Sequence, residues 1–426
     1  MTEKKYGRLI FMVMPNKKQE ELMFKHVNYS RFVRNKLVEQ CNNLNDKGLS
    51  VNRVSIHKEY NKIKGNNLWL KEVSVTSLNN VSRNLYNDYL RYFNKKARRP
   101  KFNSKKRSKK YFYPREGHNR LYVNENQELQ VEKIGKIKIS KGSWKNNKEK
   151  LFKVQEIDRI RKPIITYDGK YWYINITYRE DLISDSQTKK ELSDEVIGID
   201  LGIKTLATCS DGKSYKNINK SSKVKKLEKQ LKRKQRQLSR KYEMNKDKLR
   251  IYHLDKEGKP IKTKSGMYKT SLLKTKNIIK LEKEIKLLIR RLKNIRNNYI
   301  HTMTKEIVEQ YPQEIVIEDL KIGNMLKNKH LSKHISKAKW FDIKQYLTYK
   351  CEDRGILLTV ANTYYPSSQT CSHCGNRLTK QDKLSLKDRT FNCTECNSSL
   401  DRDLNASINL MNYRYSKWYR NYIDSK

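Results

Sequence analysis

The sequence predicts a multidomain protein of the α+β class. Three features carry this prediction: long stretches of helical periodicity, a cluster of short β-type runs between them, and two Cys-x-x-Cys pairs near the C-terminus. The chain has 426 residues, which corresponds to roughly two to four domains of about 100–200 residues each. We therefore expect these features to belong to several domains.

The charge of the chain indicates a polyanionic partner. Lys and Arg number 95 against 45 Asp and Glu, which gives a net charge of +50. Such an excess destabilises a compact fold unless a polyanion neutralises it, and nucleic acid is the obvious candidate. The 27 Tyr residues argue against a disordered basic tail. No signal peptide or apolar span is evident, so we expect no membrane contact and a cytoplasmic, bacterial nucleoid-associated location.

The N-terminal part begins with a predicted strand and two predicted helices. Residues 5–14 are rich in large apolar and β-branched side chains, which favours a strand. Residues 20–44 and 68–93 carry apolar residues at helical spacing, which predicts two long helices.

A basic tract follows at residues 95–110, where ten of 16 positions are Lys or Arg and aromatic residues come directly after. A solvated charged face is the usual explanation for such a tract. We favour nucleic-acid contact, because the tract also carries Phe102 and lies between Pro100 and Pro114. The candidate contact residues are Lys101, Lys105, Lys106 and Arg107.

Residues 119–179 are rich in short β-type runs, which predicts a small antiparallel barrel. One of these runs is Phe152-Lys-Val, and the turn pair Asp168-Gly169 separates two others. The polar segment 181–194 is expected to be a linker.

A new domain is expected to open at Glu195. Residues 196–212 predict a β-hairpin whose first strand contains Asp200. Residues 223–241 predict a basic helix and residues 277–303 a longer one with a heptad-like apolar stripe, which we interpret as simple helix packing. The Lys-rich stretch between the two helices, residues 244–269, is expected to be a loop.

Four cysteines have the spacing of a zinc ribbon. They form two Cys-x-x-Cys pairs, and the spacer from Gly375 to Asn392 is 18 residues. A redox pair and disulfides are the rival interpretations, and a cytosolic context disfavours both. The predicted ligands of one structural Zn²⁺ are Cys371, Cys374, Cys393 and Cys396.

Three carboxylates stand out by their positions. Asp200 lies inside an apolar strand, Glu318 ends a second one, and Asp403 begins a helix-like run. A carboxylate on an apolar strand is costly unless it is paired or binds metal, and Mg²⁺ prefers such oxygen ligands. Each is a weak signal alone, because an Asp at a strand end is more often a turn or cap residue.

Four motifs contain these carboxylates and the first cysteine pair, and their order along the chain is more specific than any single residue. They are Gly198-Ile-Asp-Leu-Gly-Ile, Ile317-Glu-Asp-Leu, Tyr365-Pro-Ser-Ser-Gln-Thr-Cys-Ser-His-Cys-Gly and Asp401-Arg-Asp-Leu-Asn-Ala. In this order they resemble the TnpB family, transposon-encoded RNA-guided DNA nucleases from which the compact type V CRISPR nucleases are thought to descend. The sequence departs from the family in having Ser407 for a usual Ala, a longer 244–269 segment and a slightly long zinc spacer.

The resemblance implies a RuvC domain of RNase H-like fold, with Asp200, Glu318 and Asp403 as catalytic acids that bind two Mg²⁺ ions, Mn²⁺ being the alternative. Asp401 is the other candidate for the third catalytic acid. Asp403 is preferred because the family's acid directly precedes the x-Asn-Ala run. The implied domains are a first strand of a wedge barrel (1–15), a helical recognition lobe (16–95), the wedge β-barrel (96–180), a linker (181–194), the RuvC domain with its helical pair 223–303 (195–365), a zinc ribbon that binds target nucleic acid (366–400), and a last RuvC segment (401–426).

The resulting function hypothesis is an RNA-guided DNA endonuclease with a guide RNA and double-stranded target DNA as partners, and a monomer as the favoured state. It would cut next to a short motif read by the protein. The alternatives are a guide-independent DNA nuclease or transposition accessory protein and an RNA-guided DNA binder without cleavage. A non-catalytic zinc-ribbon DNA-binding protein is disfavoured by the acids on strands.

Overall fold

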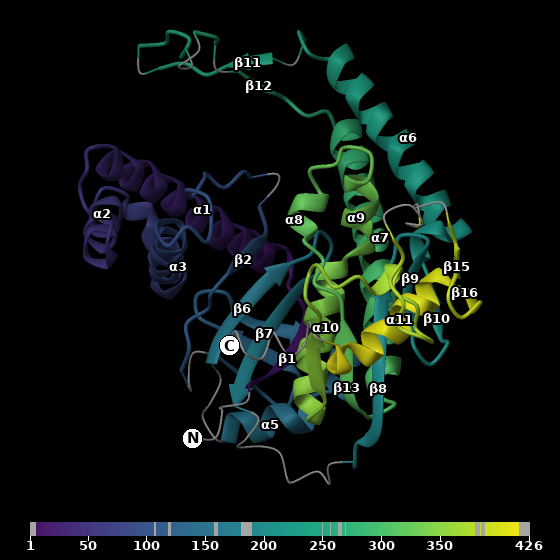
Figure 1. Cartoon of the computed structure of the whole chain (residues 1–426). Helices are drawn as coiled ribbons and strands as arrows, with labels where there is room; N and C mark the ends of the chain where they lie inside the picture. The colour runs from purple at the N-terminus through teal and green to yellow at the C-terminus, as the bar shows by residue number, and fades with distance from the viewer. Residues whose placement is uncertain are drawn as a thin grey trace. The chain divides into compact units, whose positions relative to one another are not determined.

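A computed structural model describes residues 6–105, 108–117, 121–156, 161–179, 190–248, 250–255, 257–262, 266–268, 270–379, 384 and 388–416. The chain divides into two compact units, Met1–Gln187 and Thr188–Lys426 (Figure 1). The division falls inside the predicted linker, of which residues 181–189 lie outside the described residues.

Helices packed around one apolar core form the first part of unit 1. Asn16 caps the first helix, because its side-chain oxygen accepts a hydrogen bond from the Gln19 amide at 2.9 Å. Apolar side chains of the helices meet in a shared core. The helices are α1 (Lys17–Asp46), α2 (Arg53–Gly65), a 3-10 helix (Leu68–Glu72) and α3 (Val75–Phe93).

The helix predicted for residues 20–44 is confirmed, and the one predicted for residues 68–93 is interrupted before Val75. The sequence did not predict α2. Its buried residues are Ile56 and Tyr60, a stripe too short to stand out as periodicity.

The second part of unit 1 is a seven-stranded sheet in which every pair is antiparallel. The predicted strand near the N-terminus lies in its interior, between β7 and β5. In spatial order the strands are β2 (Lys110–Phe112), β6 (Arg161–Tyr167), β7 (Trp172–Arg179), β1 (Tyr6–Met14), β5 (Gly135–Ile139), β4 (Glu128–Val131) and β3 (Leu121–Val123).

Two short helices, α4 (Lys141–Lys145) and α5 (Lys148–Glu156), interrupt the strands of unit 1. The prediction of a β-type run at residues 152–154 was therefore wrong. Leu151 and Val154 are both fully buried, and their spacing of three places them on one face of α5. A run of three residues is too short to distinguish the helical repeat of 3.6 residues from the strand repeat of two residues.

Unit 2 is built on a five-stranded mixed sheet, and the predicted hairpin at residues 196–212 is confirmed as its β8–β9 pair. β8 pairs antiparallel with β9 and parallel with β13, which pairs parallel with β14. β8 starts inside the segment predicted as a linker. In spatial order the strands are β10 (Ser214–Lys216), β9 (Thr205–Cys209), β8 (Ser193–Leu201), β13 (Pro312–Ile317) and β14 (Leu357–Val360).

Helices cover both faces of this sheet. Ile197 and Ile199 pack in one core with side chains of α7 (Lys276–Val308), α9 (Ser332–Ala338) and α10 (Trp340–Arg354). On the opposite face, Val316 packs with Leu410 of α11 (Arg402–Met411). The remaining helices of the unit are α8 (Ile322–Met325) and the 3-10 helices Ile218–Lys220, Ser367–Gln369 and Asn412–Tyr415.

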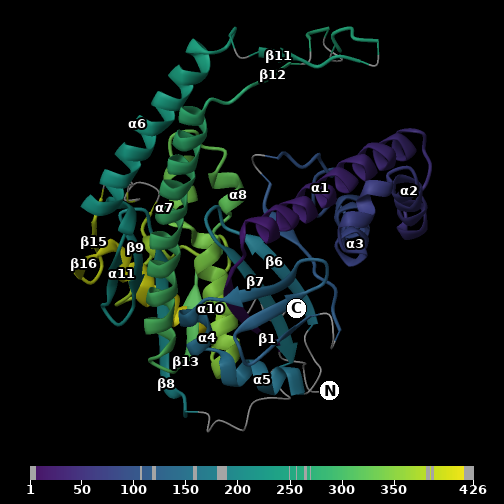
Figure 2. The same ribbon diagram turned by 180° about the vertical axis from the view of Figure 1, so that it is seen from behind.

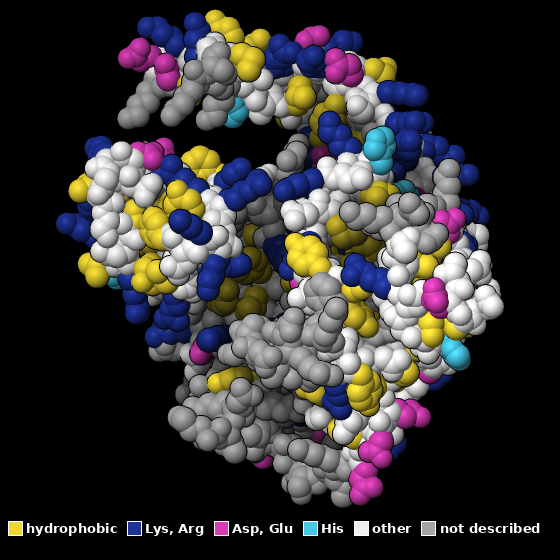
Figure 3. Space-filling view, viewed as in Figure 1, with side chains coloured by type: hydrophobic (Ala, Val, Ile, Leu, Met, Phe, Trp, Pro, Cys, Tyr) yellow, Lys and Arg dark blue, Asp and Glu magenta, His cyan; other side chains and the backbone are white. Residues whose placement is uncertain are grey.

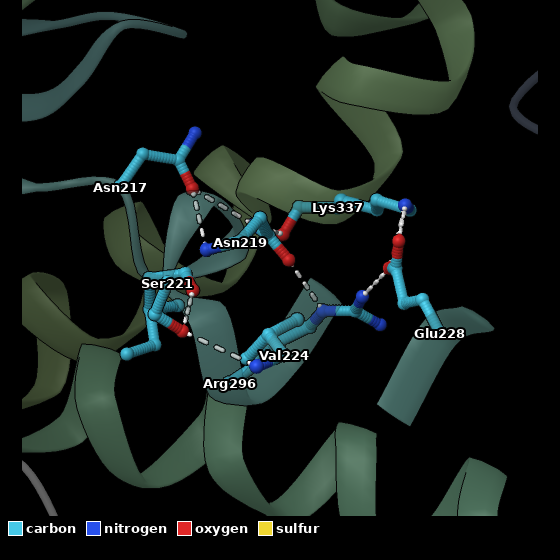
Figure 4. A network of polar contacts seen from close by, with 8 residues as sticks. Asn217, Asn219, Ser221, Val224, Glu228, Arg296 and Lys337 are labelled. Atoms are coloured by element: carbon cyan, nitrogen blue, oxygen red, sulfur yellow. Dashed lines mark hydrogen bonds and ion pairs between the residues drawn. The ribbon is translucent and has the colours of Figure 1, made fainter. Parts of the chain in front are cut away.

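The two predicted long helices of unit 2 are α6 (Ser222–Met244) and α7, which run side by side in both views (Figures 1 and 2). A polar network fixes the start of α6 against its neighbours (Figure 4). Glu228 of α6 accepts from Arg296 of α7 and from Lys337 of α9, each at 2.5 Å. Arg296 also donates to the Asn219 side chain at 2.7 Å. One carboxylate thus ties three helices together.

The segment between α6 and α7 forms a small antiparallel pair, β11 (Arg250–Tyr252) with β12 (Thr270–Leu272). The prediction of a loop at residues 244–269 was wrong to this extent. These strands have only three residues each and lie in a Lys-rich stretch that contains Gly. The alternation of apolar and polar residues that marks a strand is therefore too short to detect in the sequence.

The C-terminal part of unit 2 carries the two Cys-x-x-Cys pairs on a small ribbon. Its strands are β15 (Thr390–Asn392) and β16 (Ser399–Asp401), which are antiparallel. β16 leads directly into α11. Among the described residues, no helix is both long enough and apolar enough to cross a membrane.

Candidate functional site

Asp200 lies near the end of β8, on the sheet face that α11 covers. Side chains of a strand alternate between the two faces. Ile197 and Ile199 belong to the core beneath α7 and α10, so Gly198 and Asp200 point to the opposite face. Val196, which has the same parity, packs with Leu410 of α11. The alternation therefore explains why an acidic residue can sit inside this apolar strand.

Glu318 leaves the sheet beside Asp200. It follows β13 directly, and β13 runs parallel to β8 with Ile317 opposite Ile199. The next residue on each strand is Glu318 and Asp200, so the two carboxylates emerge at the same end of neighbouring strands. Both residues are half-buried.

Asp403 reaches this place because α11 packs directly against the backbone of β8. A Cβ atom on Gly198 would lie 2.0 Å from the Ser407 carbonyl oxygen and 2.4 Å from the Met411 amide nitrogen. Such distances are far below van der Waals contact, so the close packing requires Gly at this position. Asp403 is in the first turn of α11 and is half-buried.

The pKa of Asp200 responds to both of the other predicted acids. Burial raises the pKa of Asp200 well above its usual range, and a side-chain hydrogen bond with Glu318 raises it further. The negative charges of Glu318 and Asp403 act in the same direction, while Arg402 opposes them. Carboxylates this close are unfavourable to each other, and a shared divalent cation would relieve their repulsion. Carboxylate oxygens are the donors that Mg²⁺ and Mn²⁺ prefer, so the chemistry of these side chains suits such an ion. Among the described residues, only the four cysteines have ligand atoms that all lie within 4.8 Å of one another.

Asp401, the competing candidate, has a different role. It is the N-cap of α11, where its side chain accepts hydrogen bonds from the amides of Asp403 at 2.9 Å and Leu404 at 3.1 Å. It is exposed, whereas Asp403 is half-buried and its charge raises the pKa of Asp200. This geometry favours Asp403 as the third acid.

Two arginines near the acids were missed from the sequence. Arg402 lowers the pKa of Asp200, and the Arg389 guanidinium lies 4.0 Å from the Asp403 carboxylate. Arg402 is adjacent in sequence to both candidate acids, which is a signal that could have been used. Arg389 comes from the ribbon and had no sequence signal.

The four predicted zinc ligands come together as expected. Their sulfur atoms all lie within 4.8 Å of one another. The Sγ atoms of Cys371 and Cys396 are 3.7 Å apart and those of Cys374 and Cys393 are 3.6 Å apart. A tetrahedral ion with Zn–S bonds of about 2.3 Å needs sulfur separations of about 3.8 Å, so four thiolates at this spacing fit Zn²⁺.

Local turns build each half of the ribbon. Gly375 and Asn397 have φ of +75° and +55°, the left-handed conformation that both turns require. The Gly375 amide donates to the Cys371 carbonyl at 3.0 Å. The Ser398 hydroxyl lies 3.3 Å from the sulfur of Cys371 and 3.2 Å from that of Cys396. Ser398 thus supports one ligand from each pair.

The described part of the basic tract is fixed to α1 in unit 1. The amide of Asn103 donates to the Asn35 side chain at 2.7 Å, and that side chain donates back to the Asn103 carbonyl at 3.1 Å. Lys101 and Lys105 are exposed, and Lys105 lines a groove between α1, α3 and this tract. Lys106 and Arg107 lie outside the described residues.

Comparisons with known proteins show which families and structures the chain is similar to. Residues 176–329 match the OrfB_IS605 family model, described as a probable transposase, and residues 340–410 match the model of the Cas12f1-like TNB domain. A relative from Escherichia coli (strain K12) is 25% identical over 94% of this chain and 90% of its own length. These matches support the predicted resemblance to the TnpB family. This relative, InsQ, is named as a candidate RNA-guided DNA endonuclease.

A second relative, from Streptomyces pristinaespiralis, is likewise named as a candidate RNA-guided DNA endonuclease. It is 26% identical over 80% of this chain and 72% of its own length. Among solved structures, a Cas12f1–sgRNA–target DNA complex has a TM-score of 0.55 at 12% identity, covering 96% of this chain and 99% of that chain. The likeness confirms the predicted fold class, a multidomain α+β protein.

Proposed function

We propose that this protein is an RNA-guided DNA endonuclease that hydrolyses phosphodiester bonds of target DNA at one RuvC-type site. The observation that carries the proposal is the convergence of Asp200, Glu318 and Asp403 from three distant segments. The relatives that cover most of the chain are named for this activity. The protein reads a short motif beside the target, and base pairing with the guide reads the rest.

Asp200, Glu318 and Asp403 would hold two Mg²⁺ ions, or Mn²⁺. Bound there, the ions supply an activated water and stabilise the charge that develops on the leaving oxygen. Asp200 shares a hydrogen bond with Glu318 and interacts electrostatically with Asp403, so it would take part in holding both ions. Arg402 lowers the pKa of Asp200, and Arg389 places a positive charge 4.0 Å from the Asp403 carboxylate. One such site has to cut both strands in turn.

Three other regions would bind nucleic acid. The four cysteines hold one structural Zn²⁺ in a ribbon that contacts target nucleic acid. Lys and Arg side chains gather along α6 (Figure 3), where they outnumber Asp and Glu by ten to two. Together with the basic tract around Lys101 and Lys105, these surfaces bind phosphate backbones, which accounts for the charge of +50. The complex is expected to contain one copy of the chain.

The first experiment is to purify the protein from cells that carry its native flanking DNA and to sequence the RNA that co-purifies. A single discrete RNA, ending in sequence from beyond the gene, supports guidance. That complex is then given a randomised target library with Mg²⁺. Cleavage next to one short motif by the wild type, and none by Asp200→Asn, is the expected result.

The alternatives give different outcomes in the same assay. A guide-independent nuclease or transposition accessory protein would carry heterogeneous cellular RNA and cut without a discrete guide. An RNA-guided binder would carry the discrete RNA and retain target DNA without cutting it. Either result would overturn the proposal.

A further inference from the structure

Two asparagines of α11 connect the helix of Asp403 to the zinc ribbon. The Asn405 side chain, which is fully buried, accepts a hydrogen bond from the Ser372 amide at 2.8 Å and donates to the Thr370 carbonyl at 2.7 Å. Ser372 and Thr370 are the immediate neighbours of the zinc ligand Cys371. One side chain of the nuclease helix thus bridges the backbone on both sides of a metal ligand.

Asn409 repeats this connection one turn later. Its amide nitrogen donates to the carbonyls of Ser367 and Thr370, both at 2.7 Å, and its side chain is almost completely buried. Residues four apart lie on the same face of a helix. Asn405 and Asn409 therefore form one polar stripe on α11. This stripe makes hydrogen bonds to the backbone that leads into the first Cys-x-x-Cys pair.

The second cysteine pair meets the same helix at its start. β16 follows Cys396 and ends at Asp401, which caps α11. The Arg402 amide also donates to the Arg389 carbonyl of the ribbon at 2.8 Å. Both halves of the ribbon therefore hold α11, one at its N-terminus and one along its buried polar stripe.

We propose that the zinc ribbon positions Asp403: with Zn²⁺ bound, Asn405 and Asn409 hold α11 at the angle that places the Asp403 carboxylate beside Asp200. Buried side-chain amides are costly to leave unpaired, so the helix follows the ribbon backbone when that backbone is ordered by the metal. Asn405 is a positioning residue in this account. The ribbon then controls divalent-cation binding at the carboxylates, in addition to any contact with DNA.

The inference rests on the proposed function of the three acids, and Mn²⁺ serves as a probe of their site. Mn²⁺ affinity is measured by electron paramagnetic resonance on the full-length, zinc-loaded protein, with zinc content determined in parallel. Asn405→Ala is compared with Ser407→Ala, which removes a buried hydrogen bond from Ser407 to the Leu404 carbonyl within the same helix. We expect Asn405→Ala to weaken Mn²⁺ binding about tenfold with zinc still bound, and Ser407→Ala to leave it unchanged.

A ribbon variant, Cys374→Ser with Cys396→Ser, completes a cycle with Asn405→Ala. We expect zinc loss to weaken Mn²⁺ binding in the wild-type background and to have little further effect in Asn405→Ala, because coupled residues are not additive. Equal effects in both backgrounds would overturn the coupling through Asn405, as would unchanged Mn²⁺ affinity with weaker DNA binding. If Asp200→Asn binds Mn²⁺ as the wild type does, the acids themselves are not the metal site and the proposed function fails instead.

Discussion

The Cys₄ cluster and the carboxylate cluster both gather candidate metal ligands in unit 2, but they are assembled in different ways. The four thiols come from two short segments, and each pair is shaped by its own tight turn at Gly375 or Asn397. The three carboxylates come from β8, the end of β13 and the start of α11, which are distant in sequence. The first cluster depends on local geometry and the second on the packing of a whole domain.

This difference has a physical consequence for the two clusters. Thiols on a two-residue spacing are brought near each other by the turn itself, so the metal completes a local structure. Burial and the neighbouring negative charges raise the pKa of Asp200, and the β8–β13 pairing and the packing of α11 against β8 hold these acids in place. Changes to the packing should therefore affect the carboxylates first.

The largest expected effect distinguishes Asp403 from Asp401, the two acids at the start of α11. Asp403→Asn should reduce target cleavage about a thousandfold, because it removes a metal ligand whose stabilisation of the transition state is worth several kcal/mol. Asp401→Asn is the matched control, since Asn caps a helix as well as Asp does. Rates are measured on one target with the guide RNA bound. The reverse ranking would make Asp401 the third acid.

A smaller loss is expected from Gly198→Ala, because the added Cβ would push α11 away from β8. A displacement of about 1 Å in an active site can cost about a hundredfold in rate, which is the expected loss of cleavage. Zinc content should remain that of the wild type. Gly323→Ala in α8 is the control, since no described atom lies within 4 Å of its added Cβ. A loss of zinc in Gly198→Ala would show that the thiolate cluster also depends on the packing of α11 against β8.

Ser398→Ala tests whether contacts outside the four thiolates support zinc binding. The hydroxyl near Cys371 and Cys396 supports two ligands, and loss of such outer contacts typically weakens metal binding by about tenfold or more. Competition with a zinc chelator measures the affinity. Ser399→Ala should have no effect, because that hydroxyl donates to Asn392 instead. Equal zinc affinities for the two variants would show that Ser398 does not support the ligands.

The smallest effect is expected at Glu228, which is far in sequence from both clusters. Glu228→Gln weakens the ion pairs to Arg296 and Lys337 and should lower the free energy of unfolding by about 1–2 kcal/mol. Denaturant unfolding of the full chain measures this change. Zinc content and Mn²⁺ affinity should both stay at wild-type values. A change in either would mean that the α6–α7 pair also supports a metal cluster.

Much of the fold could be predicted from periodicity where the segments are long or strongly patterned. The helices α1, α6 and α7 and the β8–β9 hairpin lie where the sequence placed them. Short elements were not predictable: α2 has only two buried residues, and α5 contains an apolar triplet that also fits a strand. In such segments tertiary packing decides between helix and strand.

The sequence by itself determined the four cysteine ligands, because a two-residue spacing fixes which sulfurs can share one ion. It also named Asp200, Glu318 and Asp403 as candidates, through four motifs in a family's order. Only the tertiary structure brought the three acids to one sheet face, assigned Asp401 to the helix cap and joined Asn405 to the ribbon. These contacts link residues far apart in the chain, and no local pattern records which distant backbone a side chain will meet.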